Sequence, residues 1–91
     1  MSTETPEHRL KRLAMRSMRR GIKEMDLILS AFAGAALGGM DAANLALYDQ
    51  LLEENDHDLY AWINGQVAAP GQYAGLIGQI AAMAQGVATQ G

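Results

Sequence analysis

The chain contains no cysteine. Disulfide bonds, cysteine-based zinc sites and thiolate nucleophiles are therefore excluded, and the absence is compatible with a reducing cytosol. Long hydrophobic runs are also lacking. The longest apolar stretch, residues 27–37, is interrupted by Ser30 and Gly34 and is too short to cross a bilayer. These absences predict a soluble cytoplasmic protein that does not insert into a membrane.

Basic residues are absent after Lys23. Residues 1–24 contain seven basic and three acidic residues, a net charge of +4, and the rest of the chain contains seven acidic residues and no basic one. Either the basic segment docks on the acidic remainder, or it is offered to a negatively charged partner. Composition alone favours the first interpretation. The arginines resemble those of a mitochondrial presequence, but Glu4 and Glu7 interrupt them, and we interpret Met1 as the mature start.

Apolar residues recur at helical spacing in the first half of the chain. They predict an amphipathic helix over residues 6–19, ended by Gly21 as a left-handed cap. A second helix is expected at the centre of the core, and the glycine-rich segment 33–40 is expected to fray into a loop. The apolar positions of the two helices are Leu10, Leu13, Ala14 and Met18, then Met25, Ile28, Leu29 and Phe32.

Three further helices are expected in the second half. Asp41 is a good N-cap for the third, which Asn55 closes, and Asp56 or Asp58 caps a short fourth helix that ends near Gly65. A last helix follows Pro70 and Gly71. The inward positions of the third helix are Leu45, Tyr48, Leu51 and Leu52. No segment alternates with period two, so the sequence predicts an all-α, single-domain five-helix bundle over residues 1–91, with flexible ends at about 1–6 and 86–91.

Residues suited to catalysis or metal binding are scarce. His8 and His57 lie on separate elements, and neither has a second ligand four residues away. The acidic run 53–58 lacks the spacing of a calcium loop and is better explained as capping the fourth helix. There is no phosphate-binding loop, dinucleotide fingerprint or nucleophile elbow. We therefore predict no catalytic residue, no metal site and no autonomous enzyme.

Nucleic-acid binding is the alternative function, because a basic amphipathic helix is its usual footprint. The basic segment has no aromatic side chain to stack on bases, since the first aromatic residue is Phe32. The third helix, which would enter the groove in a helix-turn-helix arrangement, carries acidic residues and no cation. Only non-specific binding through the first helix remains as an alternative.

The segment from Arg19 to Glu24 is the most informative part of the sequence. Arg19 and Arg20 follow the first helix, Gly21 makes the turn, and Glu24 lies in the first turn of the next helix. Each charge is placed where a helix dipole favours it, which indicates a well-capped corner. A functional interpretation is also open, because the backbone of a partner can approach a glycine closely between an arginine and a carboxylate.

Two motifs resemble those of a known family. The first is Arg20-Gly21-x-x-Glu24, followed by Met25-Asp26-Leu27. The second is Asp56-His57-Asp58-Leu59-Tyr60-x-Trp62-Ile63, preceded by Leu51-Leu52. This pair, over residues 9–65, resembles the small flavinylation factors of succinate dehydrogenase, which comprise the bacterial FAD assembly factor and its mitochondrial counterpart. The sequence departs from the family pattern in three places. It has His57 where a proline is common, a glycine-rich segment at residues 33–40, and a last helix without charge.

The resemblance implies an assembly factor, or chaperone, in the form of a five-helix bundle. Such a protein binds the flavoprotein subunit of succinate dehydrogenase, with fumarate reductase as a second candidate, and promotes covalent attachment of FAD. The flavin is attached to the partner and is not held stably by the factor. The motif residues Arg20, Gly21 and Glu24 carry the implied partner-binding role. The apolar last helix leaves self-association open as a further possibility.

Overall fold

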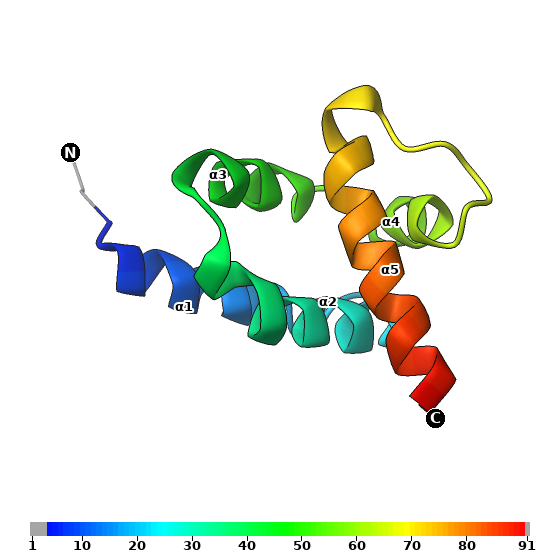
Figure 1. The fold of residues 1–91 in the computed structure, drawn as a ribbon, viewed down its shortest axis with the longest axis horizontal. Helices are drawn as coiled ribbons and strands as arrows, with labels where there is room; N and C mark the ends of the chain where they lie inside the picture. Colours follow the sequence, from blue (N-terminus) through cyan, green and yellow to red (C-terminus); the bar gives the residue numbers. More distant parts are fainter. Residues whose placement is uncertain (1–3, 91) are drawn as a thin grey trace.

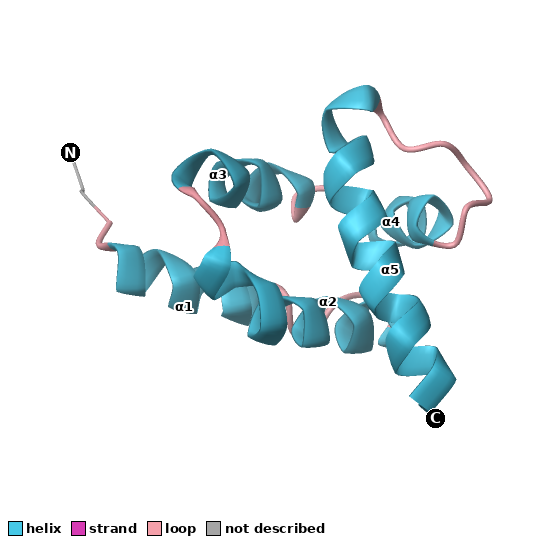
Figure 2. Cartoon of the chain, in the orientation of Figure 1, coloured by secondary structure: helices cyan, strands magenta, loops and turns pink. Residues whose placement is uncertain are grey.

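The structure is a computed structural model that describes residues 4–90, with side chains through residue 84. This part of the chain forms five α-helices and two short 3₁₀ turns and contains no strand (Figure 2). The prediction of an all-α bundle is therefore confirmed. The elements are α1 (Pro6–Arg16), α2 (Lys23–Ala36), η1 (Leu37–Gly39), α3 (Ala42–Leu51), α4 (Asp56–Ile63), η2 (Gly71–Tyr73) and α5 (Ala74–Gln90).

The helix α2 is the central element. It packs along α1 in a hairpin and also contacts α4 and α5. The helix α5 in turn crosses α2 and α4 (Figure 1). The helix α3 runs beside α1, to which it is joined by ion pairs at Asp49, and Glu53, just after the end of α3, pairs with Arg16 as well. None of the described helices is long and apolar enough to span a membrane.

Much of the core is formed by the apolar faces that helical spacing predicts. Met18, which was assigned to the apolar positions of the first helix, is instead 48% exposed, because α1 ends at Arg16. The buried residues are Leu13, Met25, Leu29, Phe32, Ala33, Leu37, Leu45, Tyr48, Leu51, Leu52, Leu59, Tyr73, Leu76, Ile77 and Ile80. At its centre, the rings of Phe32 and Tyr48 lie 5.6 Å apart between centroids. The Tyr48 hydroxyl is 2.6 Å from Oγ of Ser17, which donates to the Leu13 carbonyl at 2.8 Å. Burial raises the pKa of Tyr48. The phenol therefore stays protonated at neutral pH and can take part in this hydrogen bond.

The helix caps confirm one prediction and correct another. Asp41 caps α3, because its carboxylate accepts a hydrogen bond from the backbone N–H of Asn44 at 2.8 Å. Asn55, expected to close α3, instead caps α4 by accepting from the backbone N–H of His57 at 2.8 Å. An asparagine oxygen satisfies a free N–H at a helix start, and α3 has already ended at Leu51. Asp56 is therefore the first residue of α4, and its carboxylate is free for other contacts.

The end of α1 also differs from the prediction. The helix stops at Arg16 and not at residue 19. The left-handed position after it is occupied by Arg19, with φ of 55°, and Gly21 does not have a positive φ. The left-handed cap predicted at Gly21 is thus wrong. Gly65 after α4, with φ of 83°, has the left-handed conformation typical of a glycine at a helix end.

Two predicted irregular segments are helical. The helix α2 continues to Ala36 and then tightens into η1, because Ala33 and Leu37 are buried in the core. Tertiary burial thus outweighs the low helix propensity of the glycines in segment 33–40. The helix α5 continues to Gln90, although fraying was expected from residue 86; residue 91 lies outside the described part.

Candidate functional site

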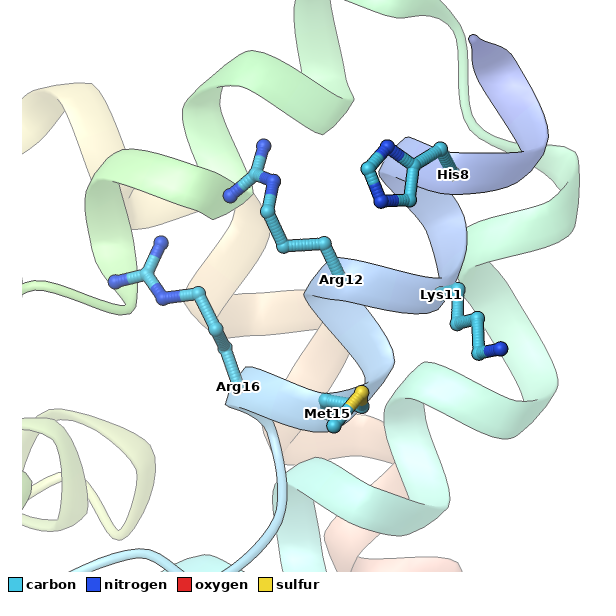
Figure 3. A pocket seen from close by; sticks show the side chains of 5 residues that line it. All are labelled: His8, Lys11, Arg12, Met15 and Arg16. Atoms are coloured by element: carbon cyan, nitrogen blue, oxygen red, sulfur yellow. The ribbon is translucent and has the colours of Figure 1, made fainter. Parts of the chain in front are cut away.

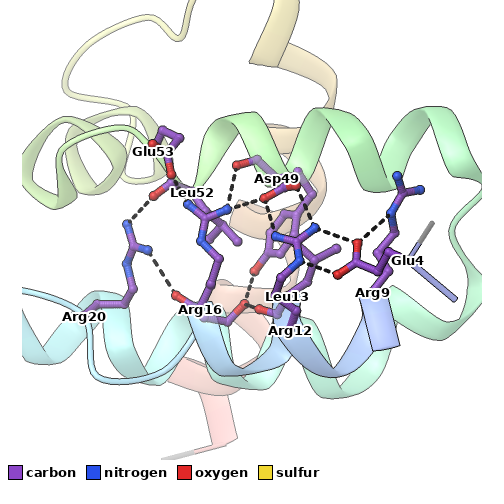
Figure 4. Close-up of polar contacts among 11 residues, drawn as sticks. Glu4, Arg9, Arg12, Leu13, Arg16, Arg20, Asp49, Leu52 and Glu53 are labelled. Carbon is purple, nitrogen blue, oxygen red and sulfur yellow. Dashed lines mark hydrogen bonds and ion pairs between the residues drawn. The ribbon is translucent and has the colours of Figure 1, made fainter. Parts of the chain in front are cut away.

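An ion-pair ladder joins α1 to α3 (Figure 4). The Arg12 guanidinium donates to the two carboxylate oxygens of Asp49 at 3.1 and 2.9 Å, and its Nε donates to Glu4 at 2.6 Å. One turn later, Arg16 pairs with both Asp49 and Glu53. For these arginines, the structure confirms that the basic first helix docks on acidic residues of the same chain.

The ladder makes the stability of the fold depend on pH. Hydrogen bonding from Arg12 lowers the pKa of Asp49, against an opposing effect of burial. A carboxyl group whose pKa is lowered by folding stabilises the folded state above its unfolded pKa of about 3.9, and this contribution is lost as the pH falls through the folded value. The contribution of Asp49 is thus present at pH 7 and disappears in acid.

We expect Asp49→Asn to lower the free energy of unfolding at pH 7 by roughly 1 kcal/mol, because the pairs it breaks are partly exposed. The difference from the unmodified chain should shrink towards pH 3. Urea denaturation at both pH values measures it. Glu54→Gln is the control, because the Glu54 carboxylate makes no hydrogen bond among the described residues. An equal loss at pH 7 and pH 3 would contradict the electrostatic explanation.

A shallow hollow of about 430 Å³ lies along α1 (Figure 3). Its described lining is His8, Lys11, Arg12, Met15 and Arg16. This lining is basic and contains no carboxylate, so it suits acidic groups better than metal ions. Over the described part of the chain, no three histidine, aspartate or glutamate side chains are grouped so that they could hold a metal ion.

The link between α1 and α2, residues 17–22, forms the corner predicted from the sequence. Its left-handed residue, Arg19, donates its backbone N–H to Oδ1 of Asp26 at 2.6 Å. Oγ of Ser30, one turn further along α2, donates to the Ser17 carbonyl at 3.4 Å. The first turns of α2 therefore hold the link in place.

Asp56 binds the two leading residues of the first motif. Its Oδ1 accepts from Nε of Arg20, and its Oδ2 accepts from the backbone N–H of Gly21, both at 2.7 Å. We call this arrangement the Arg20–Asp56 clamp. The Arg20 guanidinium also donates to the carbonyls of Arg16 at 3.1 Å and Leu52 at 3.2 Å. One side chain thus joins the end of α1, the end of α3 and the start of α4.

The clamp gives Arg20 a second role beside the helix-end interaction expected from the sequence. Only 11% of the Arg20 side chain and 17% of the Asp56 side chain are exposed, so the pair is largely buried. At Gly21, an added Cβ would lie 2.8 Å from Oδ2 of Asp56, which is closer than a real Cβ approaches another atom. The close approach of Asp56, whose carboxylate would have to shift to admit a side chain, therefore favours glycine here, and the backbone conformation of Gly21 does not.

The three predicted site residues differ in their surroundings. Arg20 and Gly21 are held together by the clamp, whereas Glu24 is exposed in the first turn of α2. The Glu24 carboxylate makes no hydrogen bond or ion pair with another described residue. Asp56 was missed as a site residue because it was interpreted as a helix cap. The available signal was its place at the start of the second motif.

Comparison with known proteins identifies the family. A family described as "Flavinator of succinate dehydrogenase" matches residues 11–84, which include the corner and both motifs. The chain belongs to this family. The resemblance noted in the sequence is therefore confirmed. The clamp joins the two motifs on which that resemblance depends.

Several curated relatives of this flavinator-family chain are named succinate dehydrogenase assembly factor 2, mitochondrial. The one from Schizosaccharomyces pombe is 44% identical over 69 residues, which cover 76% of this chain and 50% of the relative. That from Meyerozyma guilliermondii is 48% identical over 59 residues, covering 65% and 44%. That from Penicillium rubens is 51% identical over 51 residues, covering 56% and 16%. The matched segment thus spans half or less of each relative.

These names decide two predictions. The relatives are assembly factors, so the prediction that the chain is not an enzyme is confirmed. The predicted cytoplasmic location is contradicted, because the relatives are named mitochondrial proteins. That prediction depended on the lack of cysteine and of long hydrophobic runs. Neither absence distinguishes a protein of the cytosol from one of another compartment in which disulfide bonds are not needed.

Proposed function

We propose that this chain binds the flavoprotein subunit of succinate dehydrogenase and promotes covalent attachment of FAD to that subunit. The observation that supports this most directly is the family match over residues 11–84, which contains the whole corner. The names of the relatives support the same enzyme as the target. Fumarate reductase is a second candidate target because it also has a flavoprotein subunit.

The chain is proposed to act by orientation. In this scheme, the partner supplies both the flavin and the residue to which it is attached. The small helical protein stabilises the partner conformation in which these two groups meet, which speeds a step that the partner carries out itself. No acid, base or nucleophile of this chain is needed for such a role.

The motif residues then have different tasks. We assign Glu24 to direct contact with the partner, because its carboxylate is exposed and not used within the fold. Arg20 and Gly21 hold the corner in shape through Asp56, and Gly21 also presents an exposed backbone. The nucleic-acid alternative is disfavoured, because Arg12, Arg16 and Arg20 are paired with carboxylates of the chain itself.

Flavinylation by variants tests this proposal. The flavoprotein subunit is expressed alone, with the unmodified chain or with Glu24→Ala, and covalent flavin is measured by its fluorescence in a denaturing gel. We expect the unmodified chain to raise covalent flavin. We expect Glu24→Ala to reduce covalent flavin, because loss of a charge central to an interface should weaken complex formation roughly tenfold or more, while its melting temperature is nearly unchanged.

Glu7→Ala is the matched control. Glu7, like Glu24, is an exposed carboxylate in the first turn of a helix, but it lies at the far end of α1 from the corner. It should support normal flavinylation. No increase in covalent flavin with the unmodified chain would remove the proposed function. Normal activity of Glu24→Ala would remove only the role given to Glu24.

A further inference from the structure

We propose that the outer face of the α1–α2 hairpin is the docking surface and that it receives an acidic, partly apolar surface of the flavoprotein. This inference depends on the proposed function and extends the partner contact well beyond Glu24. We define the hairpin face as Lys11, Met15, Met18, Arg19, Lys23 and Leu27. Two independent observations support it, namely the position of exposed apolar side chains and the position of unpaired cations.

The exposed apolar side chains gather on the hairpin. Four large hydrophobic residues are exposed in the described part of the chain: Met15 by 65%, Met18 by 48%, Leu27 by 61% and Val67 by 53%. The first three belong to the hairpin, and only Val67 lies elsewhere, in the loop after α4. Grouped exposed apolar residues mark interaction surfaces, whereas single ones are ordinary.

Helix geometry puts these residues on the side opposite the core. On α1, Lys11 and Met15 are four residues apart and flank the buried Leu13. On α2, Leu27 lies midway between the buried Met25 and Leu29, so it points away from them. The helices α1 and α2 are in contact and are joined through the corner, so the proposal takes their outward stripes together as one docking surface.

The unpaired cations lie on the same face. Of the seven basic residues, Arg9, Arg12, Arg16 and Arg20 each have a carboxylate oxygen within 4.0 Å. Over the described residues, no carboxylate oxygen lies that close to the side-chain nitrogens of Lys11, Arg19 or Lys23. Figure 3 shows Arg12 and Arg16 reaching away from Lys11 and Met15. The cations left over are exposed and can be reached by a partner, and they favour one with acidic groups.

Apolar side chains between the cations favour a protein over a nucleic acid. Methionine is enriched in protein interfaces, where it adapts to the opposing surface. Protein surfaces that bind nucleic acid often use aromatic rings that stack on the bases. The aromatic residue of the hairpin, Phe32, is buried and cannot do this. The hairpin face therefore fits an apolar patch with acidic residues around it.

The experiment measures binding of the purified flavoprotein subunit to the full chain by calorimetry. Leu27→Glu places a repelling charge in the apolar part, and Val67→Glu makes the same change at a similarly exposed residue elsewhere. We expect Leu27→Glu to weaken binding tenfold or more and Val67→Glu to change it less than twofold. The double variant Lys11→Glu, Lys23→Glu should also bind weakly and should lose most of the salt dependence. Circular dichroism checks that each variant is folded.

Each outcome has a distinct meaning. If both hairpin variants bind like the unmodified chain, the hairpin face is not the docking surface, although the proposed function stands. If the unmodified chain neither binds the subunit nor raises its covalent flavin, both proposals are overturned. The inference is also wrong if the hairpin face binds nucleic acid. In that case the unmodified chain would bind a DNA duplex at physiological salt, and the double lysine variant would lose DNA binding while its binding to the subunit is unchanged.

Discussion

Replacing Arg20 by alanine is expected to destabilise the folded chain by about 2–4 kcal/mol and to lower the melting temperature by roughly 10–30 °C. The substitution leaves the largely buried Asp56 carboxylate without its cation. It also removes the guanidinium that donates hydrogen bonds to the carbonyls of Arg16 and Leu52, at the ends of α1 and α3. Both effects are costly because the carboxylate left behind is largely buried and the two carbonyls are partly buried. Thermal melts followed by circular dichroism measure the change.

Arg19→Ala is the matched control for this experiment. Arg19 is the neighbouring arginine, is exposed, and has no carboxylate within 4.0 Å of its side-chain nitrogens among the described residues. Alanine in its left-handed conformation is strained much as arginine is, so stability should change by only about 0.5 kcal/mol or less. Arg20→Lys should recover part of the loss, since lysine keeps the charge but lacks the planar fork. Equal melting temperatures for Arg20→Ala and Arg19→Ala would show that the clamp contributes nothing.

This expected result changes how functional data on the motif should be interpreted. A flavinylation defect in an Arg20 variant can arise from loss of the corner's shape and does not by itself indicate a lost contact with the partner. Glu24 and Leu27 are better probes of contact, because both are exposed and neither holds the fold together. Comparison of stability with binding separates the two kinds of residue.

The helices and their buried faces could be predicted from the sequence because helical periodicity is a local property. The stripe Leu45, Tyr48 and Leu51 is buried as expected, and Asp41 caps its helix. The glycine-rich end of α2 could not be predicted in the same way. Its helical conformation depends on burial of Leu37 by residues that are distant in the sequence.

The corner was predicted in place but not in detail. Gly21 signals a special backbone position, yet a left-handed conformation and a close approach both favour glycine. The choice between them depends on Asp56, which lies 35 residues further along the chain. The pairing of Arg20 with Asp56 is likewise not encoded in local spacing. A single sequence shows that charges are present but not which of them meet in the fold.

A double-mutant cycle at Gly21 and Asp56 tests the close-approach explanation. Gly21→Ala alone should cost about 1–3 kcal/mol, because the new Cβ overlaps Oδ2 of Asp56 and forces the clamp apart. In an Asp56→Ala background the clashing oxygen is gone. The same substitution should then be neutral or should stabilise the chain by up to about 1 kcal/mol, since alanine restricts the unfolded state more than glycine does.

Asp56→Ala by itself removes the anion that faces Arg20, so the cycle starts from a weakened fold. Urea denaturation of all four proteins, with an added osmolyte where needed, gives the coupling free energy between the two sites. We expect a coupling of roughly 1–3 kcal/mol. In the double variant, the Cβ added at residue 21 still lies 4.0 Å from the Cβ of residue 56, which is an ordinary van der Waals contact. Gly21→Ala could instead lower the free energy of unfolding equally in both backgrounds. Glycine would then be needed at position 21 for its backbone conformation, and the clamp would not explain the Arg-Gly pair of the motif.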